Sequence, residues 1–206
     1  MPGELRGLEH LQQNYGALNW STVLQPAINT ARCGFPVTQD LVHQMLSATA
    51  GRSDFLTNNP TWAIDFAPNG TRLGLGDTIT RKRYADTLET IAQKGANAFY
   101  TGAIANATIK ALRAANGTMT LGDLANYTVA IRPPAEIEYR GYRVKSCGAP
   151  SSGVVALSAL KTVEGYQDFG EASMVNLSTH RVDEAIRFAY GEVGTYLYPS
   201  IVKYKI

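Results

Sequence analysis

The segment that most constrains the fold is residues 139–153, YRGYRVKSCGAPSSG. Residues 129–146 are typical of short strands, interrupted by Pro133-Pro134 and by a tight turn at Gly141. Ser151 or Ser152 then precedes an apolar run with helical spacing, so one of these serines is expected to cap a helix. A strand pair that leads directly into a helix predicts a layered arrangement of helix on sheet.

The rest of the chain is dominated by helical patterns. Gly34 and Gly95 follow two of them and are expected to end the helices there. Residues 60–75 are rich in turn signals, and PNGT at 68–71 suggests a hairpin tip. We predict helices over residues 3–15, 21–33, 81–94, 102–114 and 177–190, with further helix starts at Thr38, Ser21, the T-x-x-D capping box at 120–123, and Ser151 or Ser152.

These patterns predict an α+β or layered α/β fold. The sequence has no internal repeat and no low-complexity linker, so residues 1–206 are expected to form a single partial domain without a secure internal boundary. A net charge of +2 gives no reason to expect nucleic acid as a partner. The cluster Arg81-Lys82-Arg83 is followed by Asp86 and Glu89, which indicates a solvated helix face. No apolar run is long enough to predict a membrane span.

Cofactor motifs are also missing from the sequence. Cys33 and Cys147 form neither a metal motif nor a redox motif, and two separate buried thiols are favoured over a disulfide. The Gly74–Asp77 segment lacks the further residues of a nucleotide-binding loop, so a turn is expected there. The sequence therefore predicts no cofactor and no metal.

Asparagine sequons are unusually frequent. Six N-x-S/T motifs occur, whereas chance would supply about two in a chain with this Ser and Thr content. They predict a glycoprotein of the secretory pathway, extracellular or at the cell surface, although an accidental excess in a Thr-rich chain is the alternative. Asn69 and Asn116 each precede a glycine in a predicted turn and are the best acceptors. The complete set is Asn69, Asn116, Asn19, Asn126, Asn176 and Asn106.

Residues 1–20 lack the apolar stretch of a signal peptide. For a secreted protein this predicts a missing start, and the chain is expected to be an internal fragment with its signal or anchor upstream of residue 1.

Candidate reactive residues are few. Ser151, Ser152 and Gly153 form a loop at a helix start, where free N–H groups attract anions, but the flanks are not those of a serine nucleophile. The three histidines are dispersed, and a site of His180 with Asp183 and Glu184 is only a remote alternative to a helix-surface histidine. Thr179 precedes His180 but follows no glycine, and we reject it as a nucleophile.

Four segments together resemble the large chain of the γ-glutamyltranspeptidases. They are residues 2–7 (PGELRG), 31–37 (ARCGFPV), 87–105 (TLETIAQKGANAFYTGAIA) and 139–153. The resemblance runs collinearly to about Tyr190, and it implies the helix-rich part of an amino-terminal-nucleophile hydrolase with an αββα core. It also implies an enzyme that cleaves the γ-glutamyl bond of glutathione and its conjugates and transfers the γ-glutamyl group to water, amino acids or peptides.

The resemblance places the nucleophilic threonine, its α-amine base and the oxyanion N–H groups on a separate small chain. An arginine that binds the substrate carboxylate would precede Pro2, so no catalytic or substrate-binding role falls on a residue of this sequence. The alternative is a truncated, non-catalytic remnant that acts as an interaction module or has no function. The matching residues are scaffold: Pro2, Gly3, Glu4, Gly7, Gln25, Pro26, Gly34, Phe35, Gly95, Phe99, Tyr100, Gly102, Asp123, Leu124, Tyr127, Tyr139, Gly141, Ser151, Ser152, Gly153, Glu184 and Ala185.

Overall fold

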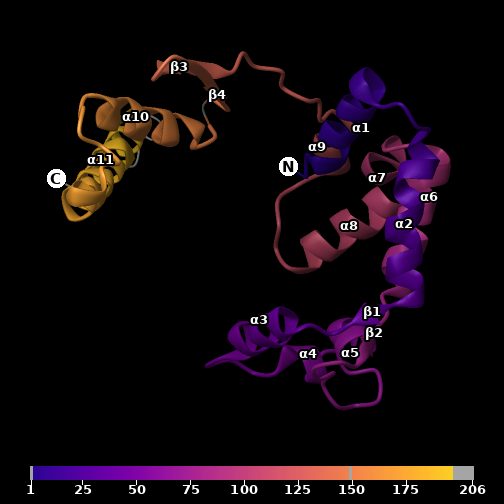
Figure 1. Ribbon diagram of the computed structural model, residues 1–206. Helices are drawn as coiled ribbons and strands as arrows, with labels where there is room; N and C mark the ends of the chain where they lie inside the picture. Colours follow the sequence, from indigo (N-terminus) through magenta and orange to yellow (C-terminus); the bar gives the residue numbers. More distant parts are fainter. Residues whose placement is uncertain (1, 149, 197–206) are drawn as a thin grey trace. The chain divides into compact units, whose positions relative to one another are not determined.

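The computed structural model describes residues 2–148 and 150–196, with side chains as far as Gly191 (Figure 1). The chain divides into two compact units, Met1–Val129 and Ala130–Ile206. This division does not test the expectation of a single partial domain, because units of one domain can be compact in themselves.

Unit 1 is almost entirely helical. Its strands β1 (Phe35–Pro36) and β2 (Thr78–Ile79) form a short antiparallel pair, in which Phe35 lies opposite Ile79. The helices are α1 (Glu4–Tyr15), α2 (Trp20–Cys33), α3 (Gln39–Thr49), α4 (Phe55–Asn58), α5 (Pro60–Phe66), α6 (Lys82–Lys94), α7 (Asn97–Tyr100), α8 (Gly102–Ala114) and α9 (Leu121–Ala125).

Three hydrophobic clusters hold unit 1 together. One surrounds the strand pair, one joins α2 to α6, and the third gathers residues from α7, α8 and α9. Arg32 of α2 adds ion pairs to Asp86 and Glu89 of α6, at 2.7 and 2.6 Å. The buried members are Val37, Met45, Leu56 and Ile79 in the first cluster, Ile28, Leu88 and Ala92 in the second, and Tyr100, Ala105 and Leu124 in the third.

Unit 2 is a two-stranded sheet covered by helices. Strands β3 (Ala135–Tyr139) and β4 (Tyr142–Ser146) are antiparallel, and α10 (Gly153–Glu164) packs on both strands and against α11 (Val175–Tyr196). A 3₁₀ turn, η1 (Ala172–Met174), precedes α11. Figure 1 shows α10 and α11 side by side.

The β3–β4 turn explains why this hairpin forms. Arg140 and Gly141 both have positive φ, 49° and 82°, as a two-residue type I′ turn requires. The Arg140 N–H donates to a Glu164 carboxylate oxygen at 2.7 Å, and Lys161 donates to the Glu138 carbonyl at 2.9 Å. These two hydrogen bonds attach the hairpin tip to the last turn of α10. The predicted arrangement, a strand pair followed by a helix that packs on it, is confirmed.

Several predicted details are wrong. The cap of α2 is Asn19, not Ser21, and residues 60–66 form a helix instead of a turn. Residues 68–71 make a turn after α5, with no strand beside it that would make a hairpin. The helical spacing of residues 81–94 predicts an inward position for Tyr84. In α6 this residue is 47% exposed, because α2 covers only the stripe formed by Leu88 and its neighbours.

The cysteine prediction also needs correction. Cys33 ends α2 and Cys147 follows β4, and both thiols are free and exposed where burial was expected. Each lies at the end of an element, where the chain leaves the packed face.

Candidate functional site

The Ser151–Gly153 loop connects β4 to α10. Ser152 occupies the N-cap position of α10, as expected, but its side chain makes no capping hydrogen bond. A Cβ on Gly153 would collide with the Ser146 side chain and with the Cys147 backbone, so only glycine fits this close approach.

An open hollow of about 640 Å³ lies beside this loop. Arg132, Lys145, Cys147 and Ser151 contribute to its wall, together with the Pro133-Pro134 pair. Lys145 pairs with Glu136 at 3.3 Å. Within the described residues, no hydrogen bond joins Ser151 or Ser152 to a histidine or a carboxylate that could act as a base. Anion binding at this loop remains a prediction.

The residues around His180 do not assemble a metal site. Asp183 and Glu184 both pair with Arg187, at 3.0 and 3.1 Å. No group of three metal-ligating side chains occurs in the part of the chain that the structure describes.

The six sequon asparagines are all exposed. Asn69 and Asn116 lie in turns, as predicted: Gly70 has φ 81°, and Asn116 itself has φ 61°. Asn19 precedes α2, Asn126 follows α9, and Asn106 and Asn176 lie within α8 and α11. Exposure makes all six accessible, and modification remains a prediction.

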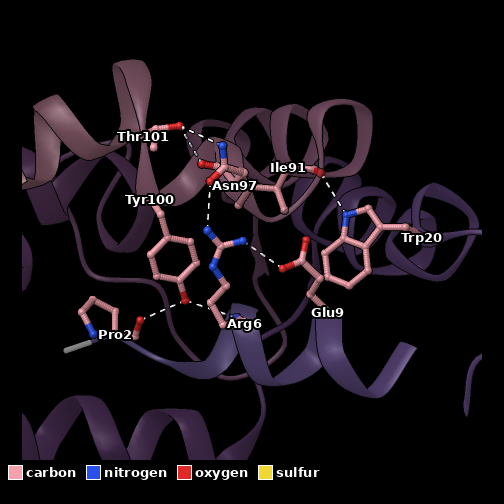
Figure 2. A network of polar contacts seen from close by, with 8 residues as sticks. All are labelled: Pro2, Arg6, Glu9, Trp20, Ile91, Asn97, Tyr100 and Thr101. Atoms are coloured by element: carbon pink, nitrogen blue, oxygen red, sulfur yellow. Dashed lines mark hydrogen bonds and ion pairs between the residues drawn. The ribbon is translucent and has the colours of Figure 1, made fainter. Parts of the chain in front are cut away.

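A network of polar contacts surrounds the PGELRG segment (Figure 2). Arg6 is bound from both sides: its guanidinium pairs with Glu9 at 2.9 Å and donates to Asn97 Oδ1 at 2.9 Å. The same guanidinium lies 4.5 Å from the centre of the Tyr100 ring, a cation–π contact. Residues 2–7 and 87–105, two of the segments that carry the family resemblance, thus meet at one place.

The Tyr100 hydroxyl forms hydrogen bonds with backbone groups at the start of α1. Gly3, the N-cap residue, has no side chain that could accept from the free N–H groups of the first turn. The Tyr100 hydroxyl accepts instead from the Arg6 N–H, at 3.2 Å, and donates to the Pro2 carbonyl, at 2.9 Å. Burial raises the pKa of Tyr100 above its ordinary value, which keeps this donor protonated.

A close approach from Tyr127, two residues after the end of α9, fixes the other side of this segment. A Cβ on Gly3 would collide with the Tyr127 hydroxyl, and the Tyr127 ring stacks on Tyr100 with centroids 6.0 Å apart. The scaffold roles expected for Gly3, Tyr100 and Tyr127 are therefore explained by contact. Sequence reasoning missed Arg6 and Asn97; the only local signal was the i,i+3 spacing of Arg6 and Glu9.

The fold defines the class of protein first. The chain matches the crystal structure of Helicobacter pylori γ-glutamyltranspeptidase with a TM-score of 0.84 and 29% identity, over 96% of this chain and 56% of that chain. It is the helix-rich part of an amino-terminal-nucleophile hydrolase fold, as the family resemblance implies.

The family follows from the sequence match. The family model described as Gamma-glutamyltranspeptidase matches residues 1–203. The chain belongs to the γ-glutamyltranspeptidase family.

Two fungal relatives are similar over most of this chain. A glutathione hydrolase proenzyme of Arthroderma benhamiae is 61% identical over 192 residues, which are 93% of this chain and 33% of the relative. A glutathione hydrolase of Aspergillus flavus is 50% identical over 93% of this chain and 32% of the relative. The chain thus spans about a third of the length of these curated relatives.

Proposed function

We propose that this chain is a large-chain segment of an enzyme that cleaves the γ-glutamyl bond of glutathione and its conjugates. The acceptor of the γ-glutamyl group would be water, an amino acid or a peptide. The observation that carries the proposal is the 61% identity to a glutathione hydrolase proenzyme over 93% of this chain.

The partner in this proposal is the small chain. Members of the family are heterodimers of a large and a small chain. The threonine nucleophile, the α-amine that activates it and the oxyanion N–H groups would come from the small chain. In support, neither Ser151 nor Ser152 is hydrogen-bonded to a histidine or a carboxylate among the described residues, and Gly153 packs closely on Ser146 of β4.

This chain would contribute positioning. Tyr100 and Arg6 fix the Pro2 carbonyl and the first turn of α1. The resemblance places the carboxylate-binding arginine before Pro2, and a fixed Pro2 would help to position it. A guanidinium that binds a carboxylate through two parallel hydrogen bonds needs this kind of fixed approach.

The cellular setting would be the secretory pathway, with the enzyme acting in glutathione breakdown outside the cell or at its surface. Six exposed sequons support this setting. None of the described helices combines the length and the apolar character needed to cross a bilayer.

Co-expression with the small chain tests the function. The large-chain segment, extended to the length of its relatives, is produced with and without a small chain that begins with threonine, and hydrolysis of a chromogenic γ-glutamyl anilide is measured. We expect turnover only where the two chains copurify. A copurifying heterodimer that hydrolyses neither the anilide nor glutathione would contradict the proposal and favour the non-catalytic remnant.

A further inference from the structure

An apolar groove runs between α1 and α2 on the surface of unit 1. Its volume is about 550 Å³, within the roughly 300–1,000 Å³ of typical ligand pockets. The side chains that line it are unusually exposed for their type: Leu8 is 45%, Leu11 56% and Tyr15 80% exposed. Trp20, Val23 and Leu24 complete the apolar lining. A concentrated apolar surface of this kind indicates an occupant.

Trp20 gives the groove a fixed wall. Its indole N–H donates to the Ile91 carbonyl of α6 at 3.0 Å, as Figure 2 shows. The ring is therefore held in one orientation while it lines the groove. A pinned aromatic ring offers a flat apolar face at little cost in conformational entropy.

The residue immediately before Trp20 is a sequon asparagine. Asn19 occupies the N-cap position of α2, where an asparagine side chain ordinarily accepts from the first turn. Here the side chain makes no such bond. The Asn19 backbone carbonyl accepts from the N–H groups of Thr22 and Val23, at 3.0 and 3.2 Å. The Asn19 side chain is exposed, and Ser21 completes the acceptor motif.

We propose that an N-linked glycan on Asn19 covers the α1–α2 groove, with its first sugar against Tyr15 and Trp20. This inference rests on the proposed passage through the secretory pathway. A pyranose ring has apolar C–H faces that suit an aromatic wall and hydroxyl groups that stay in water. The glycan thus turns an exposed apolar surface into a solvated one.

The transfer reaction is balanced with a lipid-linked oligosaccharide as co-substrate. A bond forms between the Asn19 side-chain nitrogen and C1 of the first N-acetylglucosamine. The bond from C1 to the lipid diphosphate oxygen breaks, and the released diphosphate receives the electron pair and, in net balance, the amide proton.

The experiment uses the complete protein secreted from a eukaryotic host. Peptide mass mapping measures occupancy at each sequon, and hydroxyl-radical footprinting measures the oxidation rate of Tyr15. Tyr142, which is 75% exposed in unit 2, is the internal reference. Four forms are compared with the wild type: Asn19→Gln, Ser21→Ala, Asn69→Gln, and a wild type trimmed enzymatically to one sugar per site.

We expect Asn19 to be occupied and Tyr15 to be oxidised several-fold faster in both Asn19→Gln and Ser21→Ala. The trimmed protein should retain the slow rate, because the first sugar is the one against the rings. Asn69→Gln should leave Tyr15 unchanged, since it removes a glycan from a different turn.

Three results would overturn the inference. If Asn19 is unmodified while Asn69 or Asn116 carries a glycan, the groove has another occupant, and the secretory setting stands. If Asn19 is occupied but Tyr15 is oxidised equally fast without the glycan, the sugar does not cover the groove. A secreted protein without a glycan at any sequon would overturn both this inference and the glycoprotein proposal, but not the proposed γ-glutamyl chemistry.

Discussion

Replacing Tyr100 with phenylalanine removes one hydroxyl and leaves the ring in its cluster. The Arg6 N–H then loses its acceptor in the first turn of α1, a loss comparable to removing a helix cap, about 0.5–2 kcal/mol. The Pro2 carbonyl loses its donor, which adds about 0.5–1.5 kcal/mol. Together we expect the opening free energy of this segment to fall by about 1–3.5 kcal/mol.

Native-state hydrogen exchange of the amides at the start of α1 measures this loss. A fall of about 1–3.5 kcal/mol corresponds to exchange that is faster by roughly 5- to 300-fold. Tyr127→Phe is the matched control: its ring stacks on Tyr100, but among the described residues its hydroxyl has no hydrogen bond. If Tyr100→Phe accelerates exchange no more than Tyr127→Phe does, Tyr100 does not cap α1 and the positioning role is refuted.

Four further predictions follow, two from the capping box, one from the sequons and one from the sheet edge. Thr120→Ala should destabilise the start of α9 by about 0.5–2 kcal/mol relative to Thr118→Ala, measured by hydrogen exchange. Hydrogen bonds from the Thr120 backbone N–H and hydroxyl lower the pKa of Asp123. The contribution of Asp123 to the folding stability is therefore present above the ordinary pKa near 3.8 and is lost as the pH falls through the lower pKa of the folded state. An NMR titration that shows an Asp123 pKa at or above the ordinary value would refute this. Asn69 and Asn116 should carry glycans after secretion from a eukaryotic host, and mass mapping that finds both unmodified would contradict their ranking as best acceptors. The chain alone should aggregate or unfold without a sharp transition, because β3 and β4 are paired only with each other among the described residues; a monomer with two-state unfolding above about 5 kcal/mol would contradict this.

Local rules predicted the parts of the fold that depend on a few neighbouring residues. The Thr120–Asp123 capping box has both of its hydrogen bonds, and Gly95 ends α6 with φ 79°. Each of these features is decided within one helical turn, so the sequence pattern contains all the groups that take part.

Features that depend on distant residues escaped prediction. The contact of Arg6 with Asn97 joins residues 91 positions apart, and no spacing rule connects them. An aromatic residue without basic neighbours, such as Trp62, is predicted to lie in the core. It is 44% exposed, because the sequence does not tell how much of a helix face a neighbour covers. The candidate site was accessible only through the family resemblance, since the reactive groups that it implies lie on another chain.

The most direct test of the proposed function is glutathione cleavage by a complete proenzyme that contains this chain and the small-chain segment. We predict self-cleavage into two chains and release of glutamate, both lost when the small chain's first threonine is replaced by alanine. Residues 1–206 alone should release none, because a nucleophile and its oxyanion donors are not replaced by other groups. Glutamate release by residues 1–206 that survives repurification and disappears in Ser152→Ala would contradict the account and assign the chemistry to a serine.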